Sequence, residues 1–184
     1  MTEWASLSPF ARNLLNPVLN ETRESPKSLT MMESIYFEEL KLGDRWTSPS
    51  RTITETDVVN FAGLTGDFDP LHVDHQFASQ SPFGRPIAHG LLGLALVAGL
   101  SSQCPRINTC AFVQIRDWQF LKPIYFGDTV HVVTEVVDLD ATAGRTGQVT
   151  WRRQLIHHDG TVLQQGELTT LVNRQHRLRR RDAA

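Results

Sequence analysis

The pattern of apolar and polar positions changes sharply at residues 88–101, AHGLLGLALVAGLS. A helix with apolar residues on every side belongs inside a protein, so this segment predicts a helix that is buried all round. It is too short to cross a bilayer, which takes roughly 20 apolar residues. The rest of the chain must therefore supply a sheet to pack around the helix.

Runs of strand-forming residues follow the predicted helix. They are separated by turn residues at Pro123, Gly127-Asp128, Ala143-Gly144 and Asp159-Gly160. Because no helical pattern interrupts them, the strands are expected to pair in an antiparallel sheet. The fold class predicted is α+β, with a long buried central helix wrapped by an antiparallel sheet. The four predicted strands are residues 110–123, 128–140, 147–160 and 161–172.

A shorter helix is predicted within residues 52–66, after the end of a strand. Thr54 is a suitable N-cap, and Asp57 lies three residues further on, as in a capping box. Apolar residues fall on one face of this helix. They are Val58, Phe61 and Ala62.

Two segments flank this helix. Residues 36–46 predict an entry strand and a turn at Gly43-Asp44. Residues 66–88 contain Pro70, Pro82 and Pro86 and are expected to form a loop with short helical turns.

Composition places the chain among ordinary globular proteins. It has 184 residues, 40% of them hydrophobic and 21% charged, enough for one domain with a core. The formal net charge of -2 suggests no nucleic-acid partner. The chain contains no run long enough for a membrane span, and its first residues do not resemble a secretory signal. A cytoplasmic protein without a membrane partner is expected.

The two cysteines, Cys104 and Cys110, have the wrong number and spacing for a zinc knuckle or a redox pair. One disulfide is compatible with the sequence, but reduced thiols are expected.

The two ends of the chain differ from its middle. Residues 1–33 are interpreted as an N-terminal extension, with a short amphipathic helix around Phe10 to Leu19. The extension is either loosely packed or a lid or dimer arm. Residues 34–174 form the predicted domain, and residues 175–184 form a basic tail, which is either a frayed end or a phosphate-binding segment.

Candidate chemistry lies in residues 66–74, GDFDPLHVD. Pro70 fixes its own φ and keeps Asp69 out of the helical region, so the segment must turn tightly. Asp67 and His72 can then converge, and a carboxylate and an imidazole that share a water can act on it as base and acid. In the alternative interpretation, the aspartate caps a backbone N–H and His72 merely lies on the surface.

A metal site is a further alternative, because five potential ligands lie close together in this stretch. The loop would have to direct them all at one point, so no metal is predicted. The five are Asp67, Asp69, His72, Asp74 and His75.

His89 and Gly90 lie where the buried helix begins. The first N–H groups of a helix have no partner within it, and that end of the helix favours negative charge. Since Gly90 has no Cβ, its N–H could bind the oxygen of a thioester as it becomes an enolate. Alternatively, Gly90 simply lets the helix pack closely on the sheet.

Together the stretches FAGLTGDFDPLHVDHQFA and FGRPIAHGLLGLALVAGL resemble the hydratase motif of MaoC-like dehydratases, the (R)-specific enoyl-CoA hydratases. The resemblance covers roughly residues 35–173. Asp69 stands where the family usually has asparagine. The residues that match the motif are Phe61, Gly66, Asp67, Pro70, Leu71, His72 and Ala78.

The resemblance implies a hot-dog fold and a hydro-lyase that needs no metal or organic cofactor. It implies that Asp67 and His72 are catalytic and that Gly90 forms the oxyanion hole. Asp67 would take a proton from water while the oxygen attacks C3 of an enoyl thioester, and His72 would help to deliver a proton to C2. The substrate would be an acyl-CoA or acyl-carrier-protein thioester, and the protein a homodimer or a higher homo-oligomer. Four further residues would contact the substrate: Pro70, Leu71, His89 and Leu91.

Two other functions remain compatible with the same fold. One is an acyl-CoA thioesterase, in which a carboxylate and water would act on the thioester carbonyl. The other is a non-catalytic member that binds an acyl thioester.

Overall fold

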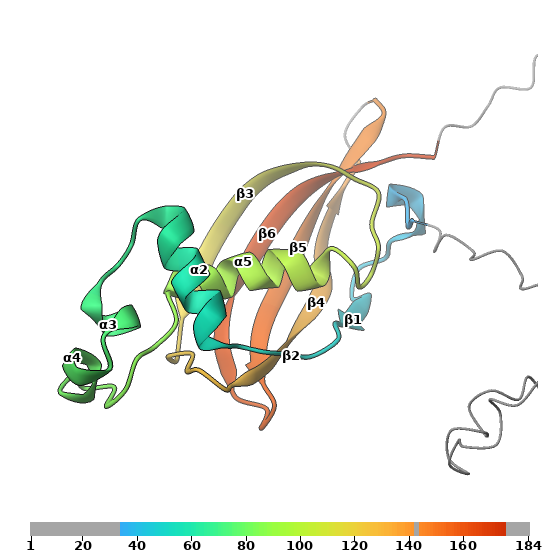
Figure 1. The fold of residues 1–184 in the computed structure, drawn as a ribbon. Helices are drawn as coiled ribbons and strands as arrows, with labels where there is room; N and C mark the ends of the chain where they lie inside the picture. The colour runs from blue at the N-terminus through green and yellow to red at the C-terminus, as the bar shows by residue number, and fades with distance from the viewer. Residues whose placement is uncertain (1–33, 142–143, 176–184) are drawn as a thin grey trace, which may run out of the picture. The chain divides into compact units, whose positions relative to one another are not determined.

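The computed structural model describes residues 34–141 and 144–175, which form a curved antiparallel sheet with one helix lying across it (Figure 1). The predictions for residues 1–33 and for the tail beyond residue 175 fall outside the described residues. In chain order the elements are η1 (Phe37–Glu39), β1 (Arg45–Thr47), β2 (Arg51–Thr52), α2 (Glu55–Thr65), α3 (Pro70–Val73), α4 (His75–Ser79), α5 (Gly90–Ser101), β3 (Thr109–Phe120), β4 (Thr129–Asp140), β5 (Thr146–His157) and β6 (Val162–Asn173).

The sheet confirms the four predicted strands and their antiparallel pairing. Its order is β1-β4-β5-β6-β3, with β2 also paired to β4. Gly127 and Gly160 adopt φ values of 89° and 92°. Glycine reaches such positive φ values readily, which explains why it occupies these two turns beside the strands. The strands β4, β5 and β6 each pair with the next strand along the chain, so neighbours in sequence lie side by side in this part of the sheet.

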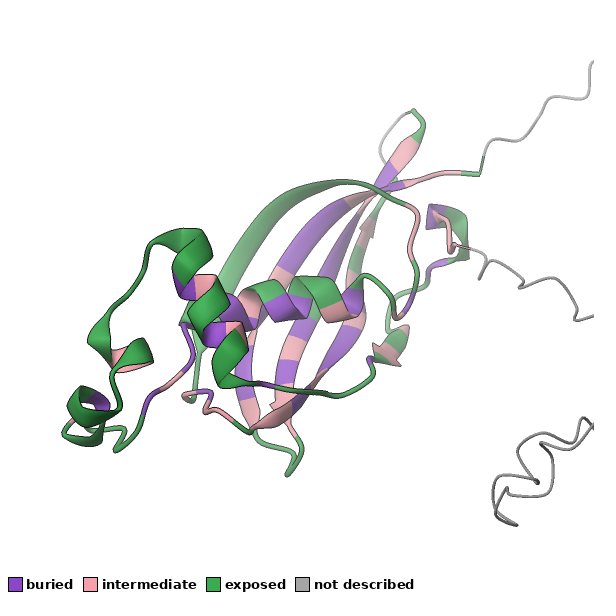
Figure 2. Ribbon diagram, viewed as in Figure 1, coloured by how far each residue is buried: buried purple, intermediate pink, exposed green. Residues whose placement is uncertain are grey.

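Helix α5 packs one face onto the sheet. Leu92, Leu96 and Val97 are buried in a cluster with residues of β4 and β5. The prediction that this helix is buried all round is wrong for the single chain, because Leu91 is 61% exposed and Ala95 and Ala98 are also exposed (Figure 2). The reason is geometric: the sheet covers only one side of the helix.

A second cluster fills the other end of the sheet. Its centre is Trp151, which is fully buried and donates from Nε1 to Thr170 Oγ1 over 2.8 Å. Phe37 of η1 packs directly over Gly147, where a Cβ would lie 2.3 Å from the ring. The cluster also contains Leu40, Val136, Val149 and Val172.

Within residues 36–46, where an entry strand and a turn were predicted, Phe37–Glu39 form a 3-10 helix instead of a strand. The Tyr36 N–H donates to Glu39 Oε2 over 2.8 Å, so a local side-chain bond stabilises the turn in place of strand pairing. The predicted turn at Gly43 is confirmed, with a φ of 84°, and β1 begins only at Arg45.

Helix α2 confirms the predicted capping box. Thr54 is the N-cap, its hydroxyl accepts from Asp57 N, and the Asp57 carboxylate accepts from Thr54 N over 2.9 Å. Val58 and Ala62 are fully buried. Residues 66–88 form the predicted loop, with α3 and α4 as its short helical turns.

Cys104 and Cys110 are free thiols, as expected. Within the described ranges, every helix is too short or too polar to cross a membrane.

Candidate active site

The end of α2 positions Asp67. Gly66 ends the helix in the left-handed conformation, with a φ of 79°, and its N–H donates to Ala62 O over 2.8 Å. Thr65 Oγ1 donates to Phe61 O over 2.7 Å and accepts from Asp67 N over 3.3 Å. These hydrogen bonds fix the main chain of Asp67 at the start of the loop that follows α2.

The short helix α3 positions His72. Asp69 is its N-cap, Pro70 is its first residue, and Asp69 Oδ1 accepts from Leu71 N over 2.8 Å. The alternative in which aspartates of this stretch bind backbone N–H groups is therefore supported as well: Asp69 caps α3, Asp74 caps α4, and Asp67 Oδ1 accepts from Asp69 N over 3.4 Å. The Asp69 carboxylate is bound at the start of α3. It therefore stabilises the turn that carries His72 and does not act together with the Asp67 side chain.

A main-chain carbonyl orients the His72 ring. Nδ1 of His72 lies 2.8 Å from Ile87 O, and Leu71 O accepts from Ile87 N over 3.3 Å. Since a carbonyl oxygen only accepts, Nδ1 must carry a proton, and in the neutral ring Nε2 keeps its lone pair. This half-buried imidazole is therefore prepared to accept a proton at Nε2.

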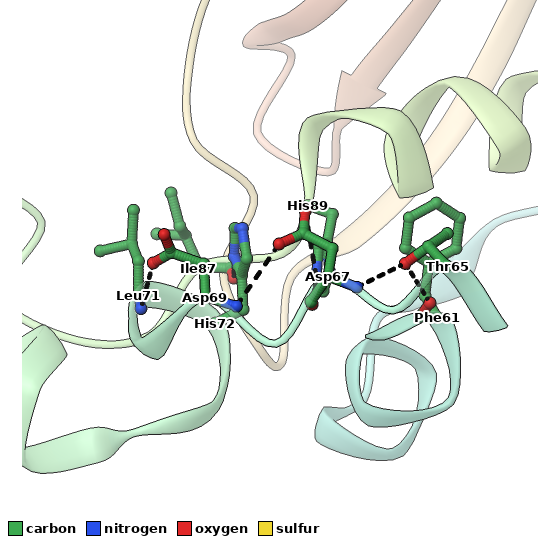
Figure 3. Close-up of polar contacts among 8 residues, drawn as sticks. All are labelled: Phe61, Thr65, Asp67, Asp69, Leu71, His72, Ile87 and His89. Atoms are coloured by element: carbon green, nitrogen blue, oxygen red, sulfur yellow. Dashed lines mark hydrogen bonds and ion pairs between the residues drawn. The ribbon is translucent and has the colours of Figure 1, made fainter. Parts of the chain in front are cut away.

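The structure brings Asp67 and His72 together. A carboxylate oxygen of Asp67, a ring nitrogen of His72 and a ring nitrogen of His89 all lie within 4.8 Å of one another, below the first turn of α5 (Figure 3). One water with two hydrogen bonds can span up to roughly 5.6 Å. The Asp67 side chain is 54% exposed, so water reaches the pair freely.

His89 lies behind this pair. Its side chain is only 2% exposed, its Nε2 lies 2.9 Å from Asp67 O, and its ring centroid lies 3.8 Å from that of His72. The sequence predicted a substrate contact for His89, but so buried a ring offers almost no surface to a ligand.

Gly90 is the first residue of α5, so its N–H has no partner within the helix. It lines a cavity of about 320 Å³ with Ile87, Phe120 and Gln164. A Cβ on Gly90 would lie 3.0 Å from Cε1 of Phe120, so the close-packing interpretation of this glycine is also supported. Asp67 and His72 do not line the cavity; Ile87, which binds His72, does.

The other predicted substrate contacts lie around the same loop. Pro70 is exposed, Leu71 is half-buried beside Ile87, and Leu91 projects from the open face of α5.

The five potential metal ligands do not converge. Asp69 and Asp74 cap α3 and α4, and His75 pairs with Glu55 over 2.9 Å. Asp67 and His72 gather instead with His89, and both imidazoles use one nitrogen on a main-chain carbonyl.

Gln164 is a residue that the sequence analysis missed. It is 1% exposed, and its Nε2 donates to Gly90 O over 3.0 Å, while its Oε1 accepts from Trp118 Nε1 over 3.3 Å. No local motif marks Gln164, because only the register of the sheet brings it under the start of α5.

Known proteins resemble this chain in sequence and in fold. The model of the MaoC like domain matches residues 41–171. Protein MaoC of Klebsiella aerogenes is 38% identical over 97 residues, which are 53% of this chain but only 29% of that protein. The (R)-specific enoyl-CoA hydratase of Rhodospirillum rubrum is 33% identical over 138 residues, 74% of this chain and 91% of the relative.

Among solved structures, the monoamine oxidase regulatory protein of Archaeoglobus fulgidus superposes with a TM-score of 0.71 at 35% identity, covering 77% of this chain and 95% of that chain. The fold confirms the predicted α+β hot-dog class. With the family model matched across the sheet, the central helix and the loop that holds Asp67 and His72, the chain belongs to the MaoC-like domain family.

Proposed function

We propose that this protein catalyses the reversible addition of water to a trans-2-enoyl thioester, carried by CoA or an acyl carrier protein, to give a 3-hydroxyacyl thioester. The observation that carries the proposal is the meeting of the Asp67 carboxylate and the His72 imidazole within 4.8 Å. The hydratase named among the relatives supports the same reaction class.

In this reaction Asp67 and a protonated His72 hold one water between them. Asp67 takes a proton from the water as its oxygen bonds to C3, and the C2–C3 π electrons move toward the thioester carbonyl. His72 Nε2 then gives its proton to C2. The proton held by Asp67 passes to His72 through the next water, which restores both groups, and dehydration follows the reverse path.

The Gly90 N–H would stabilise the carbonyl oxygen as it gains charge. Its place at the start of a 12-residue helix adds the favourable field of that helix end. The cavity beside Gly90 is lined mainly by apolar side chains, which suits part of an acyl thioester.

Incubation with crotonyl-CoA tests the proposal. The protein should consume the enone absorbance without releasing thiol, and Asp67→Asn and His72→Ala should each slow turnover by about a hundredfold or more. His75→Ala serves as the control, because His75 is 62% exposed and pairs with Glu55. Release of free thiol would indicate a thioesterase instead. No reaction with enoyl-CoA or enoyl-carrier substrates would favour a non-catalytic binding protein.

A homodimer is part of the proposal. β3 lies at the end of the strand order and is exposed along almost its whole length (Figure 2). A long apolar edge of this kind is normally covered, and pairing with a second copy would also cover the open face of α5. The exposed apolar residues of this edge are Phe112, Val113, Ile115, Phe120 and Leu121.

Light scattering on the intact chain tests the dimer. Ile115→Lys should give a monomer, whereas Leu64→Lys, at an exposed position on α2, should leave the dimer intact. A monomeric wild-type protein would contradict the proposal.

A further inference from the structure

We infer that His89 is a positioning residue, which holds Asp67 and His72 at their working separation without touching the substrate. The inference rests on the proposed function of that pair. It replaces the substrate contact that the sequence predicted for His89.

Helix capping does not explain why the His89 ring is buried at the start of α5. His89 is the N-cap of α5, yet its side chain makes no capping hydrogen bond. Residues that cap helices well are serine, threonine, aspartate and asparagine. The ring turns instead toward Asp67 in the loop between α2 and α3, and Phe61 of α2 contacts it at a centroid distance of 5.1 Å.

The hydrogen bond to Asp67 defines the chemical form of His89. Because Asp67 O only accepts, the proton must lie on Nε2. Nδ1 is buried and has no partner among residues 34–141 and 144–175, so a second proton there would be buried without an acceptor. His89 thus donates from Nε2 to a main-chain oxygen, and its Nδ1 has no partner in this part of the chain, an arrangement that suits a structural bond and not proton transfer.

His89 contacts both members of the pair at once. Its Nε2 holds the Asp67 main chain at 2.9 Å, and its ring stacks on His72 with the planes 31° apart. The stack limits the tilt of the His72 ring, while Ile87 O fixes its Nδ1 edge. Rotation of His72 would break one contact or the other.

The two anchors come from a single extended segment. Ile87 binds His72, and His89, two residues later, binds Asp67. Between them, Ala88 N donates to Ile124 O over 2.8 Å, which ties the segment to the chain just before β4. The segment thus clamps the two ends of the loop, and its length sets the distance between carboxylate and imidazole.

Two variants separate the two contacts. His89→Phe keeps an aromatic ring and loses the donor, whereas His89→Gln keeps a donor and loses the ring. His89→Phe should lower kcat by about tenfold to a hundredfold, because small misplacements are costly, and leave KM within about threefold. His89→Gln should recover part of kcat. His75→Phe, the same exchange at an exposed histidine outside the pair, should keep wild-type kinetics.

Nitrogen NMR of the histidine rings gives a readout independent of turnover. Wild-type protein and His75→Phe should show His72 protonated at Nδ1 and His89 at Nε2, and His89→Phe should lose the single Nδ1–H form of His72. If His89→Phe does not fold, His89→Gln tests the ring contact alone: it keeps a donor for Asp67 O, and loss of the stacked ring should again remove the single Nδ1–H form of His72.

The possible negative results distinguish an error in the proposed function from an error in the role of His89. A wild-type protein with both predicted ring forms but no hydratase activity would overturn the proposed function. A folded, active His89→Phe with wild-type kcat and an unchanged His72 ring would overturn the inference. A raised KM at constant kcat would return His89 to substrate binding.

Discussion

The side chain of Gln164 donates a 3.0 Å hydrogen bond to the main-chain oxygen of Gly90, although 74 positions separate the two residues. Its oxygen accepts from Trp118 Nε1. The orientation of the amide is fixed by its partners, since a carbonyl only accepts and an indole N–H only donates. The bond ties the first residue of α5 to β6 and so fixes the place of the proposed oxyanion hole.

Replacing Gln164 by leucine should affect both stability and turnover. Gly90 O and Trp118 Nε1 would lose a buried partner, which costs about 1–3 kcal/mol of the free energy of unfolding. The Gly90 N–H would shift with the helix end, so kcat should fall as well. Urea unfolding and the crotonyl-CoA assay measure the two effects. Gln165→Leu is the control, because Gln165 bonds to Gln119 and Gln154 and is only half-buried. Equal losses in both variants would contradict the role of Gln164.

Gly93→Ala should destabilise the protein even though alanine is the better helix former. The new Cβ would lie 2.3 Å from Gln164 Nε2 and 2.7 Å from Ile124 Cδ1, and such overpacking costs about 1–3 kcal/mol. Gly63→Ala in α2 is the matched control, since a Cβ there meets nothing within 4 Å. That variant should gain up to about 1 kcal/mol. Thermal unfolding of both compares the two sites, and a stabilised Gly93→Ala would refute the close approach of α5 to the sheet.

Asp69→Asn should be tolerated. The amide oxygen of asparagine can accept from Leu71 N as the carboxylate does, and asparagine caps helices about as well. Asp69→Ala should instead lose about 1 kcal/mol of stability and loosen the turn that carries His72. Steady-state kinetics and urea unfolding of both variants check this pair. Loss of activity in Asp69→Asn alone would show that the charge at this position matters to the reaction.

Asp57 should make the stability of the protein sensitive to acid. Burial acts to raise the pKa of this carboxyl, but hydrogen bonds from Thr54 and the pairing with Arg51 outweigh it and lower the pKa. A lowered pKa in the folded state gives a stabilisation that is fully present above the ordinary aspartate pKa of about 3.9 and is lost as the pH falls from there through the lower pKa of the folded state.

The comparison of Asp57→Asn with wild type measures this contribution. The variant should be less stable by about 0.5–1 kcal/mol near neutral pH, and the difference should disappear in acid, at a pH below the lowered pKa of Asp57. Asp140→Asn, at the exposed end of β4, is the control. An equal difference at both pH values would mean that the charge of Asp57 plays no part.

Several elements of this fold could be predicted from the sequence, because they depend on interactions between residues that are close in the chain. The capping box of Thr54 and Asp57 starts α2, the glycine turns separate the long strands, and the apolar run of residues 90–101 forms α5. Each of these depends on residues within a few positions of one another, so each leaves a readable pattern in the chain. The turn at Pro70 between Asp67 and His72 is also local, but their catalytic role was implied by the resemblance to MaoC-like dehydratases and stays a proposal.

Only the tertiary structure decided what surrounds that pair. His89 binds Asp67 across 22 positions, Ile87 binds His72 across 15, and Gln164 reaches Gly90 across 74. Contacts this distant depend on how the sheet and α5 pack, and no periodicity or spacing in the chain encodes them. The same packing leaves one face of α5 open, which an apolar sequence alone could not reveal, because it shows what a helix prefers to bury and not what is present to cover it.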